Sequence, residues 1–171
     1  MNTREIQRNY LEIKSLKDLL QVKKPNAAIK IFYLDPPDFQ INKFFYKQIG
    51  KKYNWIDRLV WDDQKWINYT VHKDVKTYVL KENENFVGYF EKIFNKERME
   101  YEIAYFGVLD EYIGINYGGY LLSEAIKFCF KEKIKRVWVH TCSLDHKNAI
   151  KNYISRGMKI FKSEKIVIKK Y

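Results

Sequence analysis

The chain has few of the residues that cross-link a small protein and no stretch long enough to anchor one in a membrane. It contains 2 Cys, 3 Pro and 7 Gly among its 171 residues. No apolar run approaches transmembrane length, and the N-terminal segment MNTREIQRNY has no hydrophobic signal core. Cys129 and Cys142 each lie in an apolar segment, which favours two buried free thiols in a reducing compartment, although a disulfide stays possible. We therefore expect a cytoplasmic protein with no membrane partner.

Metal ligands are also scarce, since the chain contains only 3 His. His140, Cys142, Asp145 and His146 lie close together in the sequence, but their spacing matches no structural zinc pattern. A second pair of ligands is absent from the sequence as well. The sequence therefore predicts no metal site.

What the chain does contain is typical of a folded globular protein. Hydrophobic residues make up 46% of it and aromatic residues 17%, and its length is sufficient for a substantial core without disulfides or metals. It shows no internal repeat, low-complexity tract or linker. We therefore predict a single domain over residues 1–171, with a core at about 27–170.

The net charge of +11 is unevenly distributed along the chain. Residues 99–125 contain five acids and no Lys or Arg, whereas residues 126–171 contain thirteen Lys or Arg and three acids. A basic surface of this kind serves a nucleic acid, an anionic cofactor or solubility alone. Because the lysines are scattered among Ile, Asn and Tyr, a solvated surface is at least as good an explanation as a nucleic-acid interface, and we do not expect a nucleic-acid partner.

The hydrophobic pattern alternates between strands and helices. Residues 3–22 have plausible helical spacing, but 10–13 fits a short strand equally well, and the pattern does not decide between them. Asp38 is a candidate helix cap, and Gly50 is expected to follow the last turn of its helix. Because 136–142 is reached through a helix, we expect it to run parallel to the strand that begins at Tyr101. Strands are predicted at 27–34, 76–81, 86–94, 101–108, 136–142 and a final hairpin of 158–161 with 166–169, and helices at 39–49, from 62 or 63, at 121–129 and at 145–156.

A glycine-containing loop connects the strand at Tyr101 to the next helix. The loop carries Gly114, Gly118 and Gly119, so the first turn of the helix lacks bulk. Unpaired N–H groups at a helix start, together with the helix dipole, favour a bound anion. The segment therefore predicts a site for a phosphate-bearing cofactor.

Three tryptophans, Trp55, Trp61 and Trp66, fall within twelve residues, with Asp57 and Arg58 between the first two. Such a cluster either fills core under a loop or forms the wall of a substrate pocket. We favour a mixture of the two, with Trp55 and Arg58 facing the substrate.

The order of these elements resembles that of the GNAT superfamily of acetyl-coenzyme A-dependent N-acetyltransferases. The loop 113–118 (IGINYG) stands at the position of that family's pyrophosphate motif, and Ala149, Tyr153 and Gly157 match its Ala-x-x-x-Tyr-x-x-x-Gly element. The chain is especially similar to a bacterial subgroup with the segments EIAYFG, RVWVHTC and LDH, here 102–107, 136–142 and 144–146. The resemblance implies an α/β fold with a mixed, mostly antiparallel central sheet, helices on both faces and a splayed pair of parallel strands.

The resemblance also implies how coenzyme A is held. It assigns the pantetheine arm to the strand residues 106–108 and the diphosphate to the N–H groups of 114–119. Ile113 stands where the family has Gln or Arg, and Asn116 replaces the central glycine, so cations from Lys127, Lys147, Lys151 or Arg156 are expected to complement the phosphates. The expected cofactor contacts are Phe106, Gly107, Val108, Ile113, Gly114, Ile115, Asn116, Tyr117, Gly118, Gly119, His146 and Lys151.

For catalysis, the resemblance matches Tyr153 to the family's general acid, which protonates the departing thiolate. Two candidates remain for the base: Glu102, acting through a water, and His140, whose ordinary pKa lies near neutrality. The alternatives are a core tyrosine, a carboxylate paired across the sheet and a hydrogen-bonded core histidine. Cys142 as an acyl-carrying nucleophile is a minor alternative, because the family transfers directly. The similarity extends through Tyr46, Trp55 and Arg58, which we assign to substrate binding.

We therefore expect an acyltransferase that moves the acetyl group of acetyl-coenzyme A to a primary amine of a small acceptor, by direct transfer in a ternary complex, as a monomer or homodimer. The alternative is a catalytically weak or inactive module that binds acyl-coenzyme A and docks on nucleic acid through its basic C-terminal third. The departures at Ile113 and Asn116 motivate this alternative. Calorimetry with acetyl-coenzyme A and thiol release over a panel of amines separate the two.

Overall fold

The computed structural model describes residues 3–169, so residues 1, 2, 170 and 171 of the expected domain lie outside the described residues. A seven-stranded sheet with the order β2-β3-β4-β5-β6-β1-β7 forms the centre of the molecule. All neighbouring strands are antiparallel except β5 and β6. The elements are β1 (Thr3–Ile13), η1 (Leu16–Asp18), β2 (Ile29–Tyr33), α1 (Phe39–Gly50), α2 (Asp63–Thr70), β3 (Val75–Glu82), β4 (Asn85–Asn95), β5 (Glu100–Val108), η2 (Asp110–Tyr112), α3 (Tyr117–Cys129), β6 (Arg136–Cys142), α4 (Ala149–Ser155) and β7 (Lys159–Lys169).

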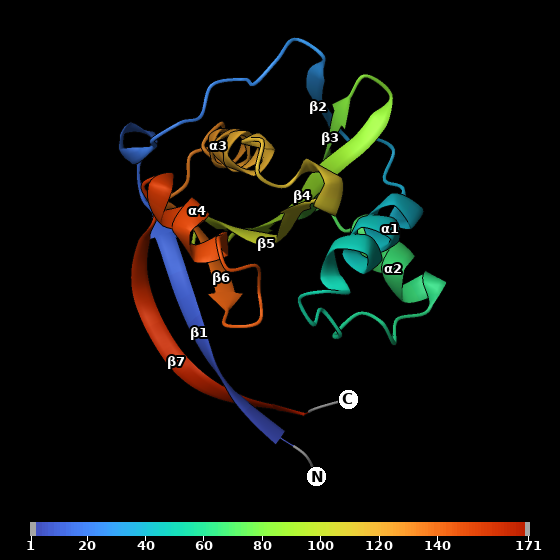
Figure 1. Cartoon of the computed structure of the whole chain (residues 1–171), viewed down its shortest axis with the longest axis vertical. Helices are drawn as coiled ribbons and strands as arrows, with labels where there is room; N and C mark the ends of the chain where they lie inside the picture. The colour runs from blue at the N-terminus through green and yellow to red at the C-terminus, as the bar shows by residue number, and fades with distance from the viewer. Residues whose placement is uncertain (1–2, 170–171) are drawn as a thin grey trace.

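Helices cover both faces of the sheet, as the fold prediction required (Figure 1). On one side, which we call the α3 face, Leu121, Leu122 and Ile126 of α3 pack in one core cluster with strand residues such as Val137 and Val139. On the opposite side, the α1 face, Phe45 and Ile49 of α1 pack on β3 and β4. The mixed, mostly antiparallel α/β architecture is therefore confirmed.

The N-terminal segment, which the pattern left undecided, forms the long strand β1. It lies between β6 and β7, with Tyr10 opposite His140 on one side and Lys162 on the other. In Figure 1, β1 and β7 form a long curved ribbon, which extends to the pairing of Thr3 with Lys169.

The predicted C-terminal hairpin is wrong, because β7 is a single strand. The residues expected to form its turn are paired instead: Ser163 lies opposite Asn9 and donates a hydrogen bond of 2.7 Å to its Oδ1. Glu164 likewise accepts a hydrogen bond of 2.6 Å from the hydroxyl of Tyr10. Since β1 offers a full-length partner, an extended β7 satisfies its backbone groups better than a hairpin on its own would.

Two predicted helix boundaries also need correction. Gly50 is the last residue of α1 rather than the residue after it, because the chain turns back there: a Cβ on Gly50 would lie 2.5 Å from the Cβ of Trp55. Helix α4 begins at Ala149 instead of 145, because the Asp145 carboxylate accepts hydrogen bonds from the Thr141 hydroxyl (2.6 Å) and the Cys142 N–H (2.9 Å). The predicted cap Asp38 is confirmed, since its side chain accepts from the Gln40 N–H, and the helix expected from 62 or 63 begins at Asp63 with Asp62 as its cap.

The parallel pair β5 and β6 separates soon after it begins. The two strands pair at only three positions, from Glu100 opposite Arg136 to Glu102 opposite Trp138. On its other side β5 has a bulge at Ala104, because Glu91 lies opposite Tyr105 while the next β4 residue, Lys92, lies opposite Ile103. A bulge adds twist and bends the strand. The backbone of β5 beyond Ile103 is therefore left without a strand partner on the β6 side.

No helix in the described part of the chain is long and apolar enough to cross a membrane. Both cysteines are free, as expected. Cys129 is buried, whereas Cys142 is only half-buried, so the expectation of two buried thiols holds for Cys129 alone.

Candidate active site

A cavity of about 520 Å³ occupies the space where β5 and β6 separate. Its walls come from both strands, the loop before α3, the start of α3, helix α4, the loop 53–57 and the outer part of β1. Two regions that are far apart in the sequence thus line the same cavity between the splayed strands. One is the glycine loop, and the other is the segment between α1 and α2.

The glycine loop takes the shape expected of an anion site. Gly114 has a φ of +90° and Asn116 a φ of 71°, so both occupy the left-handed region that Gly, and next to it Asn, adopts most readily. Asn116 caps α3 without a side-chain hydrogen bond, and Gly118 and Gly119 of the first turn line the cavity. The N–H groups of this turn are therefore available to a negatively charged group.

Cations reach this end of the cavity from α4 and its C-cap. A Cβ on Gly119 would lie 2.6 Å from Nη1 of Arg156, so the guanidinium packs directly over the first turn of α3. Lys151 also lines the cavity, and Asn152 donates a hydrogen bond of 3.3 Å to the carbonyl of Gly118. Of the four candidate cations, Lys151 and Arg156 line the cavity, whereas Lys127 is ion-paired with Glu124.

Tyr153 lies across the gap from β5. Its ring centroid is 6.2 Å from that of Phe106, and the residue is buried while still lining the cavity. Burial raises the pKa of the phenol, and the nearby Asp145 carboxylate raises it further, so the hydroxyl keeps its proton. No hydrogen bond of this hydroxyl occurs within residues 3–169, which leaves the proton available to a ligand.

Glu102 and His140 face each other where the strands begin to separate. Their closest atoms, Glu102 Oε1 and His140 Nε2, are 3.9 Å apart. Burial raises the pKa of the Glu102 carboxyl, partly offset by the positive charge of Arg58. Burial also lowers the pKa of the His140 imidazole, so His140 is neutral near pH 7. Both candidate bases are thus adjacent, and each has a pKa shifted toward the uncharged form.

The known family that matches the chain is the acetyltransferase (GNAT) family, whose model covers residues 28–158. The chain belongs to the GNAT acetyltransferase family. A comparison with curated proteins finds no match.

Solved structures support the same fold at low sequence identity. A GCN5-related N-acetyltransferase from Kribbella flavida is 14% identical, with a TM-score of 0.66, over 96% of this chain and 58% of that one. One from Sphaerobacter thermophilus is 13% identical, with a TM-score of 0.69, over 97% and 52%. An aminoglycoside acetyltransferase from an uncultured soil metagenomic sample, in complex with trehalose, is 14% identical, with a TM-score of 0.66, over 78% and 90%. The chain thus spans little more than half the length of the first two.

Most of the residues expected to contact coenzyme A surround this GNAT cavity. His146 lines it and accepts a hydrogen bond from the Asn148 N–H (3.1 Å), whereas the N-cap of α4 is Asn148, so the structure does not make His146 the helix cap. Ile115 and Tyr117 lie outside the lining: Ile115 is exposed, and the buried Tyr117 bonds through its hydroxyl to Asn26 (3.0 Å) and to Glu82. The lining includes Phe106, Gly107, Val108, Ile113, Gly114, Asn116, Gly118, Gly119, His146 and Lys151.

Of the three residues assigned to substrate binding, Trp55 is the one that lines the cavity. Its indole N–H donates to Asp145 Oδ1 at 3.4 Å, and its ring lies 4.9 Å from that of Tyr105. Trp55 therefore links the loop 53–57 to the turn after β6.

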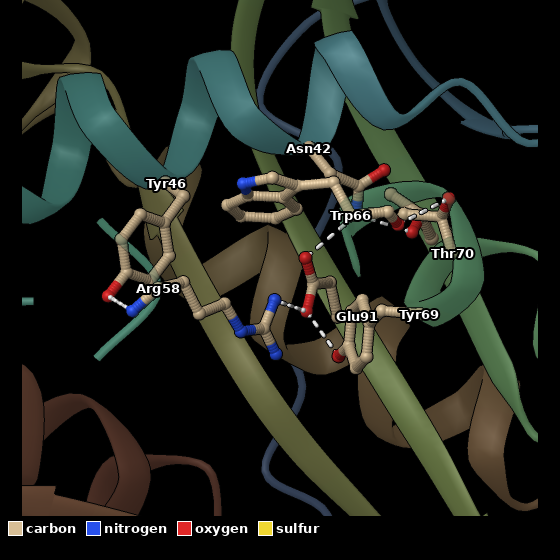
Figure 2. Close-up of polar contacts among 8 residues, drawn as sticks. Asn42, Tyr46, Arg58, Trp66, Tyr69, Thr70 and Glu91 are labelled. Atoms are coloured by element: carbon tan, nitrogen blue, oxygen red, sulfur yellow. Dashed lines mark hydrogen bonds and ion pairs between the residues drawn. The ribbon is translucent and has the colours of Figure 1, made fainter. Parts of the chain in front are cut away.

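Arg58 and Tyr46 lie beneath that loop, in a sealed polar cluster (Figure 2). Nη1 of Arg58 is 2.9 Å from Oε2 of Glu91, and Glu91 also accepts from Tyr69 (2.6 Å) and Asn42 (2.7 Å). Glu91 is fully buried and Arg58 is 6% exposed. Burial alone would lower the pKa of the Arg58 guanidinium, but the Glu91 carboxylate raises it above its usual value. Neither Arg58 nor Tyr46 belongs to the cavity lining.

The structure brings further polar residues to the cavity that sequence reasoning did not assign to it. Arg8 comes from the segment whose secondary structure the pattern left open, so its face could not be assigned. Asp145 and Asn152 lie in and after a turn whose position was predicted as helix. The sequence did contain a sign of a turn at Asp145, because Asp side chains commonly form hydrogen bonds with nearby backbone N–H groups in turns. Within residues 3–169 no group of three or more His, Cys, Asp or Glu side chains is arranged to hold a metal ion.

Proposed function

We propose that this GNAT protein is an N-acetyltransferase that transfers the acetyl group of acetyl-coenzyme A to a primary amine of a small acceptor, directly and within a ternary complex. One observation carries the proposal. The cavity joins an uncapped helix start, an unpaired edge of β5, a buried phenol and the imidazole of His140 in one continuous space, and Glu102, outside the lining, lies 3.9 Å behind His140.

The residues present fit coenzyme A at both of its distinctive parts. Its diphosphate matches the first turn of α3, where the N–H groups and Arg156 supply positive charge without any cation in residues 99–125. Its pantetheine arm carries amides, which need hydrogen-bond partners along an extended path. The backbone of Phe106 to Val108 borders the cavity and has no partner on the β6 side.

When bound, acetyl-coenzyme A supplies an acetyl group activated as a thioester. Tyr153 holds the proton that the departing sulfur needs, and its raised pKa keeps that proton on the oxygen until charge develops nearby. Phe106, 6.2 Å away, keeps this part of the cavity apolar. Tyr153 therefore serves as the general acid.

The Glu102–His140 pair takes up the proton of the attacking amine. A carboxylate whose pKa is raised is a stronger base than an ordinary one, and the imidazole next to it is neutral near pH 7 and therefore also able to accept a proton. The half-buried thiol of Cys142 is unsuited to carry the acyl group, because burial raises its pKa and disfavours the thiolate. This supports direct transfer over an acyl-enzyme.

The proposal is tested by calorimetry with acetyl-coenzyme A, followed by thiol release over a panel of primary amines. We expect binding in the micromolar range and release that depends on the amine. Absence of binding at millimolar concentration would refute the acetyltransferase function. Binding without release from any amine would instead support the alternative, an acyl-coenzyme A-binding module without turnover.

A matched variant shows whether the measured binding occurs at this cavity. Arg156→Met removes the cation next to Gly119 and is expected to weaken acetyl-coenzyme A by about tenfold. Lys159→Met, which removes an exposed lysine outside the cavity lining, is the control and should leave the affinity unchanged.

A further inference from the structure

We propose that Arg8 recognises an anionic group on the acceptor, a carboxylate or a phosphate, so that the preferred substrates are amines that also carry a negative charge. The inference rests on the proposed function and adds the chemical class of the acceptor. It comes from a cation that lines the cavity and has no hydrogen-bond or ion-pair partner within residues 3–169.

Arg8 lies on the face of the sheet opposite α3 and α4. Leu11 and Ile13 of β1 point into the core under α3, so the even-numbered residues of the strand point to the α1 face. Arg8 lies directly opposite Cys142 on β6, and cross-strand partners share a face. Arg8 therefore approaches the cavity from the side of Trp55 and Asp57, both of which also line it.

The guanidinium of Arg8 has no hydrogen bond and no ion pair within residues 3–169. Its Nε is buried and unsatisfied, which is uncommon for a group with so many donors. The nearest carboxylate across the ribbon, that of Glu164, is already occupied by the Tyr10 hydroxyl (2.6 Å) and the Lys162 ammonium (2.9 Å). The donors of Arg8 are therefore free to bind a ligand in the cavity.

This cation is separate from those at the diphosphate end. Lys151 and Arg156 belong to α4 and its cap, and α4 packs on the α3 face through Tyr153 and Ile150. The diphosphate site at Gly119 is thus supplied with charge from its own side of the sheet. Arg8 is not needed there, which leaves it for the acceptor.

The groups around His140 define where the two ends of such an acceptor would lie. Burial lowers the pKa of His140, Arg8 lowers it further, and Asp57 and Asp145 act in the opposite direction, so all three charges lie near the imidazole. Asp145 is engaged by Thr141 and the Cys142 N–H. An amine therefore fits near Asp57 and His140, both of which line the cavity, while its anionic group fits against Arg8.

The test uses amines in matched pairs that differ in the anionic group. γ-Aminobutyrate is compared with butylamine, and phosphoethanolamine with ethanolamine, so the carboxylate and phosphate arms are separate. Thiol release is measured for each with acetyl-coenzyme A, and calorimetry measures the binding of each amine to the protein. For at least one pair, we expect the anionic member to have a kcat/KM about 10- to 100-fold above its neutral partner.

Three variants assign that preference to Arg8. Arg8→Met should abolish it without changing the affinity for acetyl-coenzyme A, and Arg8→Lys should retain part of it because the charge remains. Arg4→Met is the matched control, since Arg4 is an exposed arginine of the same strand outside the cavity lining, and it should behave as wild type.

Equal kcat/KM values within both pairs, or a preference that survives in Arg8→Met, would overturn the inference. A loss of acetyl-coenzyme A affinity in Arg8→Met with the preference intact would assign Arg8 to the cofactor instead. If acetyl-coenzyme A does not bind or no amine releases thiol, the proposed function fails and the inference is judged by calorimetry alone. Anionic-amine binding that is lost in Arg8→Met then supports it, and the absence of such binding refutes it.

Discussion

Two arginines on the same side of the molecule have opposite surroundings. Arg58 is almost fully buried, ion-paired with Glu91 and surrounded by the rings of Tyr46, Trp61, Trp66, Tyr69 and Tyr105. Arg8 lines the cavity with no partner among the described residues. The charge of Arg58 is thus neutralised by Glu91, whereas the charge of Arg8 is available to a ligand. The cluster around Arg58 stabilises the fold, and the cavity at Arg8 is the region that binds.

The sealed cluster explains how the loop that forms one wall of the cavity is held. The N–H of Arg58 donates to the Tyr46 hydroxyl at 3.0 Å, so the end of the loop is tied to α1 while the Arg58 side chain is tied to β4 (Figure 2). Trp55 at the other end contacts Gly50, Tyr105 and Asp145. Residues 53–57 therefore present Trp55 and Asp57 to the cavity from a fixed position.

The largest expected effect is on stability, from Arg58→Met. Removal of the guanidinium leaves the Glu91 carboxylate buried with no counter-charge, and breaking such a pair typically costs about 3–5 kcal/mol. Urea unfolding should show this loss in the free energy of unfolding. In the double variant Arg58→Met/Glu91→Gln, which has no buried charge, part of the loss should be recovered. A loss below about 1 kcal/mol in the single variant would contradict the structural role of this cluster.

Within the cavity, Tyr153→Phe should affect turnover and leave stability almost unchanged. Loss of the proton donor is expected to lower kcat by about tenfold to a thousandfold, with little change in acetyl-coenzyme A affinity. The free energy of unfolding should change by less than about 1 kcal/mol, because the hydroxyl has no hydrogen bond within residues 3–169. Tyr120→Phe, a half-buried tyrosine of α3 outside the cavity lining, is the control. Unchanged turnover in Tyr153→Phe would remove Tyr153 from the role of acid.

The pH profile identifies the base. Burial raises the pKa of Glu102 and lowers that of His140, so kcat/KM should fall as the pH is lowered from neutral and these groups become protonated. Glu102→Gln should lower kcat/KM by about tenfold to a hundredfold and change this acidic limb, because only His140 then titrates in the pair. If Glu102→Gln leaves both rate and profile unchanged while His140→Gln removes the limb, His140 is the base.

The smallest expected effect is that of Arg8→Met on the free energy of unfolding. It is to be compared directly with the large loss expected for Arg58→Met. Because Arg8 has no partner in the described part of the chain, its removal breaks no ion pair and relieves a partly desolvated charge. The free energy of unfolding should stay within about 1 kcal/mol of wild type or increase slightly. A loss as large as that of Arg58→Met would mean that Arg8 is structural rather than a ligand group.

Much of the fold could be predicted from the sequence because local patterns determine it. The strand at Arg136–Cys142, the cap Asp38, the helix start near Asp62 and the parallel direction of β6 all follow from local pattern and connection type, and all are confirmed. The position of β1 could not be predicted, because it depends on pairing with β6 and β7 more than a hundred residues later. The hairpin at the C-terminus failed for the same reason.

The candidate site was predicted well where it consists of contiguous backbone and less well where it depends on side chains from distant elements. Residues 106–108 line the cavity, as do all residues of 113–119 except Ile115 and Tyr117. The sequence could not distinguish Arg58 from Arg8, since exposure and partners decide their roles and both are set by tertiary packing. Arg58 is buried because it forms an ion pair with Glu91 on the central strand β4, and the sequence does not show that these two residues meet.

The central claim, that the gap between β5 and β6 holds acetyl-coenzyme A, is tested most directly by following backbone amide resonances during its titration. We predict that the largest shifts fall on 106–108 and 114–119, that they saturate in the micromolar range, and that the amide of Glu91 in the sealed cluster barely moves. An absence of shifts at millimolar concentration, or shifts centred away from these segments, would contradict the account.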